Sequence, residues 1–245
     1  AGLLSNMIAA TVAQELRLHG PAFTSDAACA SSLVSIAQAA TSLRAGVIDC
    51  ALAGGVYICI TPEHHIAFSR IGAMSRSGNC LPFDERADGF IQGDGCGVLV
   101  LKRLADAQRD GDRIWAVVDG IAMNNDGGGE GPMAPVKSGQ IEVITAAWED
   151  AGRDTAQLGY MEAHGTGTTV GDAVELSGLT EVFAGNTGIA LGSCKANVGH
   201  TMSAAGVAGV LRAALAIHHE TLPPMANFET AKPELELQSS PFCIP

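Results

Sequence analysis

Charged and aromatic residues are both scarce in this chain, and the shortage of charge excludes a disordered protein. Charged residues make up 16% of the 245 residues and aromatic residues 4%, whereas apolar residues reach 47%. Disorder requires low hydrophobicity and a high charge density, so we expect a folded chain whose interior is built from Ala, Val, Ile and Leu. The length allows one large domain or two small ones.

Basic residues are few, with 14 Lys and Arg against 26 Asp and Glu and a net charge of −12. The imbalance is concentrated after residue 113, where 5 basic residues stand against 15 acidic ones. A nucleic-acid-binding protein needs a basic surplus to meet phosphates, and we expect no nucleic-acid partner. Basic residues are enriched between residues 70 and 113, and charge alone favours a solvated face there.

Long hydrophobic runs are absent as well. The longest uncharged apolar run, residues 51–60, has ten residues, whereas a membrane-spanning helix needs about 20, and no secretory signal is visible. Seven cysteines are scattered without a CxxC pair or a metal-ligand spacing, which is typical of reduced thiols. The sequence therefore predicts a cytoplasmic protein without a membrane partner and without a metal.

Strand and helix signals alternate along the chain. The patterns predict helices over residues 7–18, 31–44, 104–110, 138–151, 173–183 and 203–218, and strands over 48–53, 97–101, 115–121, 159–163 and 189–193. Gly54 and Gly55 are expected to close the first of these strands. Apolar strands that alternate with helices favour an α/β fold with sheets covered on both faces. The tail from residue 230 to 245 is expected to be irregular.

Three short segments place a reactive side chain at a turn beside a predicted strand. The first is Ser-Asp-Ala-Ala-Cys-Ala-Ser-Ser-Leu, residues 25–33, with Cys29 before a predicted helix. The positive end of a helix dipole lowers the pKa of a thiol and favours a nucleophile. By itself, a free cysteine is more often a small buried residue.

The second and third segments each carry a histidine. His164 lies in Glu-Ala-His-Gly-Thr-Gly-Thr, residues 162–168, and His200 ends Lys-Ala-Asn-Val-Gly-His, residues 195–200. Both follow a predicted strand closely, and sites in open α/β sheets form at the carboxyl ends of strands. A cysteine and two histidines, each at its own strand-to-helix junction, therefore form a candidate active site.

These three segments, in this order, resemble the active-site motifs of β-ketoacyl synthases, the condensing enzymes of fatty-acid and polyketide assembly. The resemblance covers essentially the whole chain and includes residues 81–97, which are similar to the family's loop before a strand. It implies a thiolase-like α/β fold of two related βαβ halves, layered α/β/α/β/α. Residues 1–112 would be the remainder of the N-terminal half with the nucleophile, and residues 113–245 the C-terminal half with both histidines.

The resemblance implies a decarboxylative Claisen condensation. Cys29 would accept an acyl chain from a thioester on an acyl carrier protein, and the enolate of a decarboxylated malonyl thioester would attack it. His164 and His200 would donate hydrogen bonds to the malonyl thioester oxygen, and His200 would also help to activate Cys29. No cofactor is implied besides the phosphopantetheine of the carrier protein, and a homodimer is expected.

The family also implies supporting roles for further residues. Lys195 and Glu175 match a charged pair that holds the site's geometry, and Asp172 can share a helix face with Glu175. The remaining matches are Thr166 and Thr168, which would reach the pantetheine arm, Asn197, which would contact substrate, and Phe90, which would line the acyl tunnel or equally well belong to the plain core.

Several alternatives stay open on the sequence alone. The family's unit is longer, so the chain is expected to be incomplete at both ends and to lack the Gly-Phe-Gly loop that supplies one oxyanion-hole N–H. A catalytically incomplete fragment that serves as a dimerisation or carrier-docking scaffold is therefore the alternative. A thiolase is disfavoured, because it uses a second cysteine where this chain has His200. The threonine in the middle of residues 164–168 is polyketide-like, and Ala27 and Ala30 favour iterative type I systems.

Overall fold

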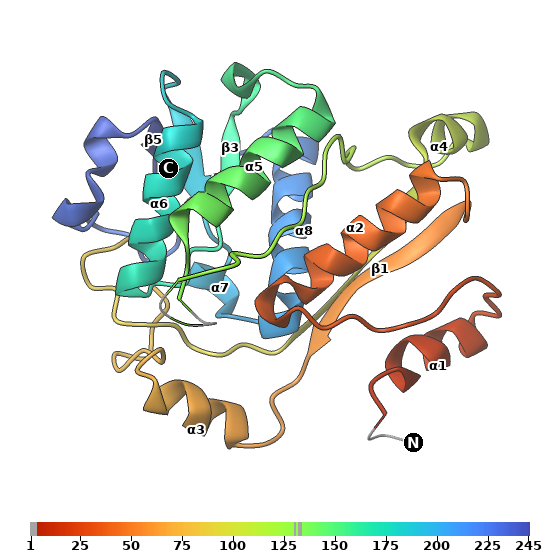
Figure 1. Cartoon of the computed structure of the whole chain (residues 1–245), viewed down its shortest axis with the longest axis horizontal. Helices are drawn as coiled ribbons and strands as arrows, with labels where there is room; N and C mark the ends of the chain where they lie inside the picture. The colour runs from red at the N-terminus through yellow and green to blue at the C-terminus, as the bar shows by residue number, and fades with distance from the viewer. Residues whose placement is uncertain (1–3, 130, 132–133) are drawn as a thin grey trace.

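The computed structural model describes residues 4–129, 131 and 134–245, and Figure 1 shows how their helices and strands are arranged. The α-helices are α1 (Met7–Glu15), α2 (Ser31–Arg44), α3 (Glu63–Arg70), α4 (Leu104–Asp110), α5 (Lys137–Ala151), α6 (Thr169–Val182), α7 (Lys195–Val198) and α8 (Ala205–His218). The strands are β1 (Cys50–Tyr57), β2 (Gly95–Lys102), β3 (Tyr160–Glu162), β4 (Ile189–Gly192) and β5 (Phe242–Cys243). None of the helices described is long and apolar enough to cross a membrane.

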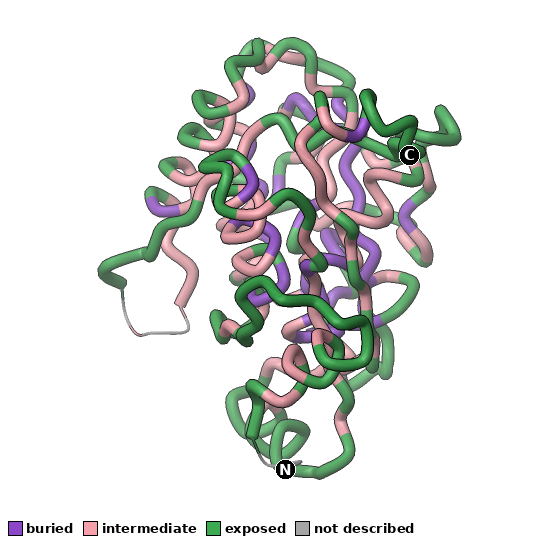
Figure 2. The backbone as a smooth tube through the Cα atoms, turned by 90° about the vertical axis from the view of Figure 1, so that its right-hand side faces the viewer, coloured by how far each residue is buried: buried purple, intermediate pink, exposed green. Residues whose placement is uncertain are grey.

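Two small sheets form the framework. β1 and β2 pair antiparallel, from Cys50 opposite Lys102 to Tyr57 opposite Gly95. β3, β4 and β5 pair parallel in the order β3-β4-β5. Helix α8 contacts strands of both sheets, and α2 lies along β1 (Figure 1). The two sheets are thereby joined, and the buried residues are concentrated along the middle of the molecule (Figure 2).

Helices α2 and α8 cover one face of the β1–β2 sheet. Ile36 of α2 and Val207 of α8 pack with Ala53 of β1 in one apolar cluster. The alternate positions of the strands face away, and Val98 and Val100 are 56% and 72% exposed. The expectation that both faces of the sheets are covered is therefore wrong for β1–β2 among the described residues. An antiparallel pair can leave one face open.

A second cluster packs α6 against the β3-β4-β5 sheet. Its large buried members are Phe83, Leu176, Leu179, Phe183, Ile189, Leu191, Met225, Leu235 and Phe242. β5, which supplies Phe242, lies in the tail of residues 230–245 that the sequence predicted to be irregular. That prediction is wrong at Phe242–Cys243, whereas the described rest of the tail has only two short 3₁₀ turns. Two residues of parallel pairing with β4 and one buried ring are enough to attach it.

β1 continues through Gly54 and Gly55, where the sequence predicted its end. A Cβ on Gly54 would lie 2.0 Å from the Gly97 carbonyl oxygen, and one on Gly55 would lie 2.6 Å from the Ser203 carbonyl oxygen. The two glycines therefore allow neighbouring backbones to approach closely and do not mark a turn.

Most predicted helices are confirmed. α2 and α4 have the predicted bounds, 31–44 and 104–110. α6 begins at Thr169, four residues earlier than predicted, which places Asp172 and Glu175 in its first two turns. Helix α3 was not predicted. α1 ends three residues early and α8 begins two residues late.

The strand predicted over residues 115–121 is absent from the described structure. The segment is apolar, but no strand of the described residues pairs with it. Side chains bind its backbone instead: Arg44 donates to the Asp119 carbonyl at 3.0 Å, and Asp150 accepts the Ile121 N–H at 2.8 Å. An apolar pattern alone does not make a strand without a backbone partner.

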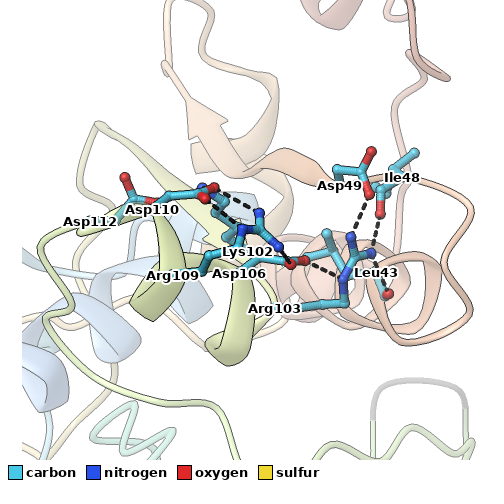
Figure 3. A network of polar contacts seen from close by, with 9 residues as sticks. All are labelled: Leu43, Ile48, Asp49, Lys102, Arg103, Asp106, Arg109, Asp110 and Asp112. Atoms are coloured by element: carbon cyan, nitrogen blue, oxygen red, sulfur yellow. Dashed lines mark hydrogen bonds and ion pairs between the residues drawn. The ribbon is translucent and has the colours of Figure 1, made fainter.

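A chain of alternating charges joins the end of α2 to α4 (Figure 3). Arg103 donates to the carbonyl oxygens of Leu43 and Ile48 at 3.1 and 2.8 Å, and it also bonds Asp49 and Asp106. The network continues through Arg109, Asp110, Lys102 and Asp112. Arg103 thus satisfies a carbonyl at the C-terminal end of α2, and this part of the basic stretch is used within the protein.

Replacing Gly54 with Ala should lower the free energy of unfolding by about 2 kcal/mol, in the range of overpacked interiors. The added Cβ would lie 2.0 Å from the Gly97 carbonyl oxygen and force β2 away from β1. Urea unfolding followed by circular dichroism measures the change. Gly159→Ala is the control, because its Cβ meets no atom within 4 Å. Equal stability of Gly54→Ala and the wild type would contradict the close packing of β1 on β2.

Candidate active site

Cys29 lies in a strained turn directly before α2. Its neighbour Ala28 has a φ of +49°, in the left-handed region that costs a residue with a side chain about 1–3 kcal/mol. Two side chains hold the turn: Asp26 accepts the Ala28 N–H at 3.0 Å, and Ser31 donates to the Ala28 carbonyl at 2.7 Å. The turn therefore places Cys29 at the start of the helix, as the sequence predicted.

The sulfur of Cys29 lies 3.1 Å from Nε2 of His200. The His200 side chain is buried, and its Nδ1 accepts the backbone N–H of Met202 at 3.1 Å. A neutral imidazole carries one proton, so an accepting Nδ1 leaves that proton on Nε2. His200 therefore donates a hydrogen bond to the sulfur and is arranged to stabilise a thiolate.

The backbone of His200 is fixed by the segment that leads into β2. Its N–H donates to the Ile91 carbonyl at 2.7 Å, and its carbonyl accepts the Gly93 N–H at 3.0 Å. Phe90 of the same segment is buried, with its ring centroid 5.0 Å from that of His200. Phe90 is therefore both a core residue and part of the wall of the site.

His164 is held through its backbone from both sides. The Glu175 carboxylate accepts the N–H groups of His164 and Gly165 at 2.6 and 2.8 Å, and Lys195 Nζ donates to the His164 carbonyl at 2.5 Å. Lys195 and Glu175 were predicted as a charged pair that holds the geometry; in the described structure each contacts the backbone of His164. The His164 ring stands edge-on to His200, with centroids 5.3 Å apart.

Asp172 supports the same loop from one turn earlier in α6. Its buried carboxylate accepts the N–H groups of Phe83 and Gly167 at 2.7 and 3.1 Å. Burial raises the pKa of Asp172 to about 7, although these two hydrogen bonds oppose the shift. Burial also raises the pKa of Glu175. The two carboxylates share one helix face, as their spacing predicted.

Burial shifts the three central groups toward their neutral forms. It lowers the pKa of His200 to about 3 and that of His164 well below its ordinary value, and the Lys195 charge adds to both effects. His164 is nevertheless an exposed residue, whereas His200 is buried. Burial raises the pKa of Cys29. This effect is larger than the lowering of the same pKa by the Lys195 charge and by the backbone N–H. The prediction of a lowered thiol pKa is therefore wrong, because desolvation opposes the charged form more strongly than one helix end favours it.

The ligand atoms of Cys29, His164 and His200 lie within 4.8 Å of one another, close enough to suggest a metal site. A metal at His200 Nε2 requires the ring proton on Nδ1, where the Met202 N–H already points. Two donors would then face each other, so the chemistry of this donor set disfavours a metal. The arrangement suits a thiol beside two neutral imidazoles.

The other predicted residues surround this centre. Thr166 and Thr168 are bonded to each other through their hydroxyl groups at 2.9 Å, and Thr166 is buried. Asn197 is exposed on the short helix α7, whose first residue Lys195 is buried. Their contacts with a substrate stay predictions.

Sequence reasoning missed the residues that act through their backbone. Met202 fixes the tautomer of His200 and Phe83 binds Asp172, both by a backbone N–H. A backbone donor leaves no trace in the residue type, so the sequence held no signal for either. Glu162 was part of a quoted motif but received no role, although a carboxylate two residues before His164 was a visible signal.

Comparison with protein families gives two matches that together span most of the chain. Residues 1–107 match the model "Beta-ketoacyl synthase, N-terminal domain" and residues 115–229 match "Beta-ketoacyl synthase, C-terminal domain". The chain is 44% identical over 239 residues to a phenolphthiocerol/phthiocerol polyketide synthase of Mycobacterium tuberculosis, covering 96% of this chain and 13% of that protein. It is 42% identical to polyketide synthase PksN of Bacillus subtilis, covering 94% of this chain and 4% of that protein.

Solved structures of two ketosynthases have folds similar to that of this chain. The ketosynthase from module 6 of the bacillaene synthase of Bacillus subtilis is 40% identical, with a TM-score of 0.96 over 99% of this chain and 44% of that chain. The oxazolomycin ketosynthase domain of Streptomyces albus is 37% identical, with a TM-score of 0.94 over 98% of this chain and 42% of that chain. The chain thus spans less than half the length of either ketosynthase.

Alkylation of Cys29 by iodoacetamide should be slow at pH 7 and accelerate past pH 9, because burial raises the pKa of the thiol and less thiolate is present below it. No inflection is expected near pH 6.5, since His200 is already neutral there. Peptide-resolved mass spectrometry between pH 6 and 10 separates Cys29 from the exposed Cys50, which is the internal control. A rate plateau reached by pH 7 would contradict a half-buried thiol that is neutral at that pH.

Proposed function

The chain belongs to the β-ketoacyl synthase family and has its thiolase-like α/β fold, and on that premise we propose that it acts as the ketosynthase domain of a polyketide synthase. The observation that carries the proposal is the 3.1 Å contact between Cys29 Sγ and His200 Nε2, with His164 edge-on beside it. In the proposed reaction Cys29 accepts an acyl chain, and a malonyl thioester supplies two further carbons after loss of carbon dioxide.

Acyl transfer uses the pair of Cys29 and His200. The sulfur attacks the carbonyl carbon of an acyl-pantetheine thioester, the bond from that carbon to the pantetheine sulfur breaks, and the leaving thiolate takes the proton of Cys29. His200 Nε2–H donates to the sulfur as negative charge develops on it. The Lys195 charge favours the same anion. Because His200 already carries its proton on Nε2, its role is to stabilise charge and not to act as the base.

Condensation uses both histidines. Loss of carbon dioxide from the malonyl thioester leaves an electron pair that places negative charge on the thioester oxygen. His164 and His200 are neutral at pH 7, given their lowered pKa values, and each can donate an N–H to that oxygen. One such donor contributes about 3 kcal/mol to other enzymes that stabilise an oxyanion. The enolate carbon then attacks the acyl carbonyl, and the bond to the Cys29 sulfur breaks.

A thiolase-type reaction fits the site less well, because it needs a second cysteine as base. Cys80 packs in the same apolar cluster as Cys29, but its Sγ donates toward the Thr166 carbonyl at 3.4 Å. Burial also raises the pKa of Cys80 to about 12. His200 occupies the position facing Cys29 instead. A purely scaffolding role does not require the contact between Cys29 and His200, so it also fits the site less well.

The basic side chains of Arg70 and Arg76 are proposed as a docking surface for an acyl carrier protein with an acidic face. Both are exposed, and neither forms an ion pair with the described residues, whereas Arg103 and Arg109 pair with Asp106. Free positive charges on a protein of net charge −12 are available to steer an acidic partner. Iterative use, dimerisation and a cytoplasmic location stay predictions of the sequence.

Incubation with an acyl-pantetheine thioester should add one acyl group to the wild-type chain and none to Cys29→Ala. Intact-mass spectrometry detects the increment, which follows from the position of Cys29 beside the His200 donor. Cys50→Ala removes an exposed thiol outside the site and should load like the wild type. Equal loading of Cys29→Ala and the wild type would overturn the assignment of the nucleophile.

The double variant Arg70→Glu with Arg76→Glu should bind an acyl carrier protein about tenfold more weakly, because two attractive charges become repulsive. Loading from free acyl-pantetheine should stay unchanged, since neither side chain belongs to the site. Titration at low and high salt measures the difference, which should shrink as salt increases. Arg17→Glu, another exposed position, serves as control. Unaltered carrier affinity in the double variant would place the docking surface elsewhere.

A further inference from the structure

Glu162 binds three groups, which come from its own strand β3, from α8 and from the turn between β4 and α7. Its Oε1 accepts the backbone N–H of Cys194 at 2.6 Å, and its Oε2 accepts from the Arg212 guanidinium at 3.0 Å and from the Tyr160 hydroxyl. The side chains of Arg212 and Glu162 are 12% and 10% exposed. A buried ion pair is weak evidence for a gain in stability. Its role here is better explained by the groups that it holds in position.

Two glycines leave space for this carboxylate and the side chains that bind it. Gly192 stands opposite Glu162 in the β3–β4 pairing, and a Cβ there would lie 2.5 Å from the Tyr160 hydroxyl oxygen and 2.8 Å from Arg212 Nη1. A Cβ on Gly209 of α8 would lie 3.1 Å from Glu162 Cγ. Gly209 therefore leaves space for the Glu162 side chain, and Gly192 leaves space for the two side chains that bind it.

The contacts of Glu162 lead to His164 by two routes. Along β3, Glu162 precedes His164 by two residues. Across to β4, it fixes the N–H of Cys194, the residue directly before Lys195, and Lys195 Nζ bonds the His164 carbonyl at 2.5 Å. The carboxylate thus ties together the two chain segments whose ends meet at His164.

The same contacts reach the nucleophile less directly. They lead there only through α7, where the N–H of Gly199, the residue before His200, donates to the Lys195 carbonyl at 3.0 Å. Cys29 is held by its own turn and by His200, and the backbone of His200 pairs with Ile91 and Gly93. None of the described hydrogen bonds of Glu162 involves these segments.

We propose that Glu162 is a positioning residue for His164, acting through Cys194 and Lys195, and that it serves the malonyl step more than the acyl-transfer step. The proposal rests on the proposed function, because it assigns Glu162 to the half of the reaction that needs His164. Displacing a catalytic group by about 1 Å can slow a reaction about 100-fold. Loss of the Glu162 charge should therefore slow the malonyl step and leave the rate of acyl transfer nearly unchanged.

The test is Glu162→Gln, an isosteric change that places an amide N–H₂ against the Arg212 guanidinium. We expect decarboxylation of a malonyl-pantetheine thioester to slow about 10- to 100-fold, and loading of Cys29 from an acyl-pantetheine thioester to stay within about threefold of the wild type. Mass spectrometry measures both rates. Equal slowing of both reactions would overturn the proposal, since a general loss of structure affects them alike.

The matched control is Asp150→Asn. The Asp150 carboxylate also binds one arginine, Arg44 at 2.8 Å, and one backbone N–H, that of Ile121 at 2.8 Å, but outside the site. It should leave both rates at the wild-type level. If Glu162→Gln does not fold, Arg212→Gln should also slow decarboxylation more than loading, because the Glu162 carboxylate then loses the guanidinium that orients it toward the Cys194 N–H.

A second readout does not depend on activity. Long-range ¹H–¹⁵N spectra of the 7 histidines, assigned with His164→Asn, should show the His164 ring signals shifted in Glu162→Gln by more than those of His200. Unmoved His164 signals would overturn the positioning role even in a chain that turns over no substrate. If the wild type neither loads nor decarboxylates, the proposed function fails, and the spectra still decide the role of Glu162.

Discussion

Two carboxylates in the first two turns of α6 accept four backbone N–H groups, and the position of His164 beside the other two reactive side chains depends on these hydrogen bonds. Three of the donors belong to the loop of residues 164–167 and the fourth to Phe83. Gly165 and Gly167 adopt φ values of +42° and +72°, so the loop cannot satisfy its own donors as a helix or strand would. Each buried donor left unpaired would cost about 1–3 kcal/mol. Helix α6 therefore determines where His164 lies.

Burial has one common effect at this site, which is to favour uncharged forms. It lowers the pKa of both histidines and raises those of Cys29 and the two α6 carboxylates. The reactivity of the thiol must then come from a directed contact, the Nε2–H of His200, and not from a high resting population of thiolate. The Met202 N–H donates to Nδ1 of His200, which keeps the ring proton on Nε2, where it faces the sulfur.

The sequence identified the side chains of the site but not the bonds that arrange them. The structure brings together Cys29, His164 and His200, which residue type and position beside the predicted strands had grouped, and helical periodicity predicted the bounds of α2. Close backbone approach was misjudged, because Gly54 and Gly55 have the residue type of a turn but allow β1 and its neighbours to touch. The thiol pKa was misjudged for a related reason, since burial is a property of the assembled fold and cannot be read from a motif.

Cys29 and His200 are 171 positions apart and lie in segments that match two separate family models. The contact between these segments is tight: Val207 N–H donates to Ser32 Oγ at 3.0 Å, and a Cβ on Gly206 would lie 2.4 Å from Leu33 Cγ. Suppose that recombination between relatives exchanges only one of these segments. Ser32 and Leu33 would then come from one parent, and Gly206 and Val207 from the other. The distance from sulfur to imidazole would then vary with how well the parents' small residues match. The contact between α2 and α8, and not the motif on either side, is therefore what limits which segments can be exchanged in a chimera.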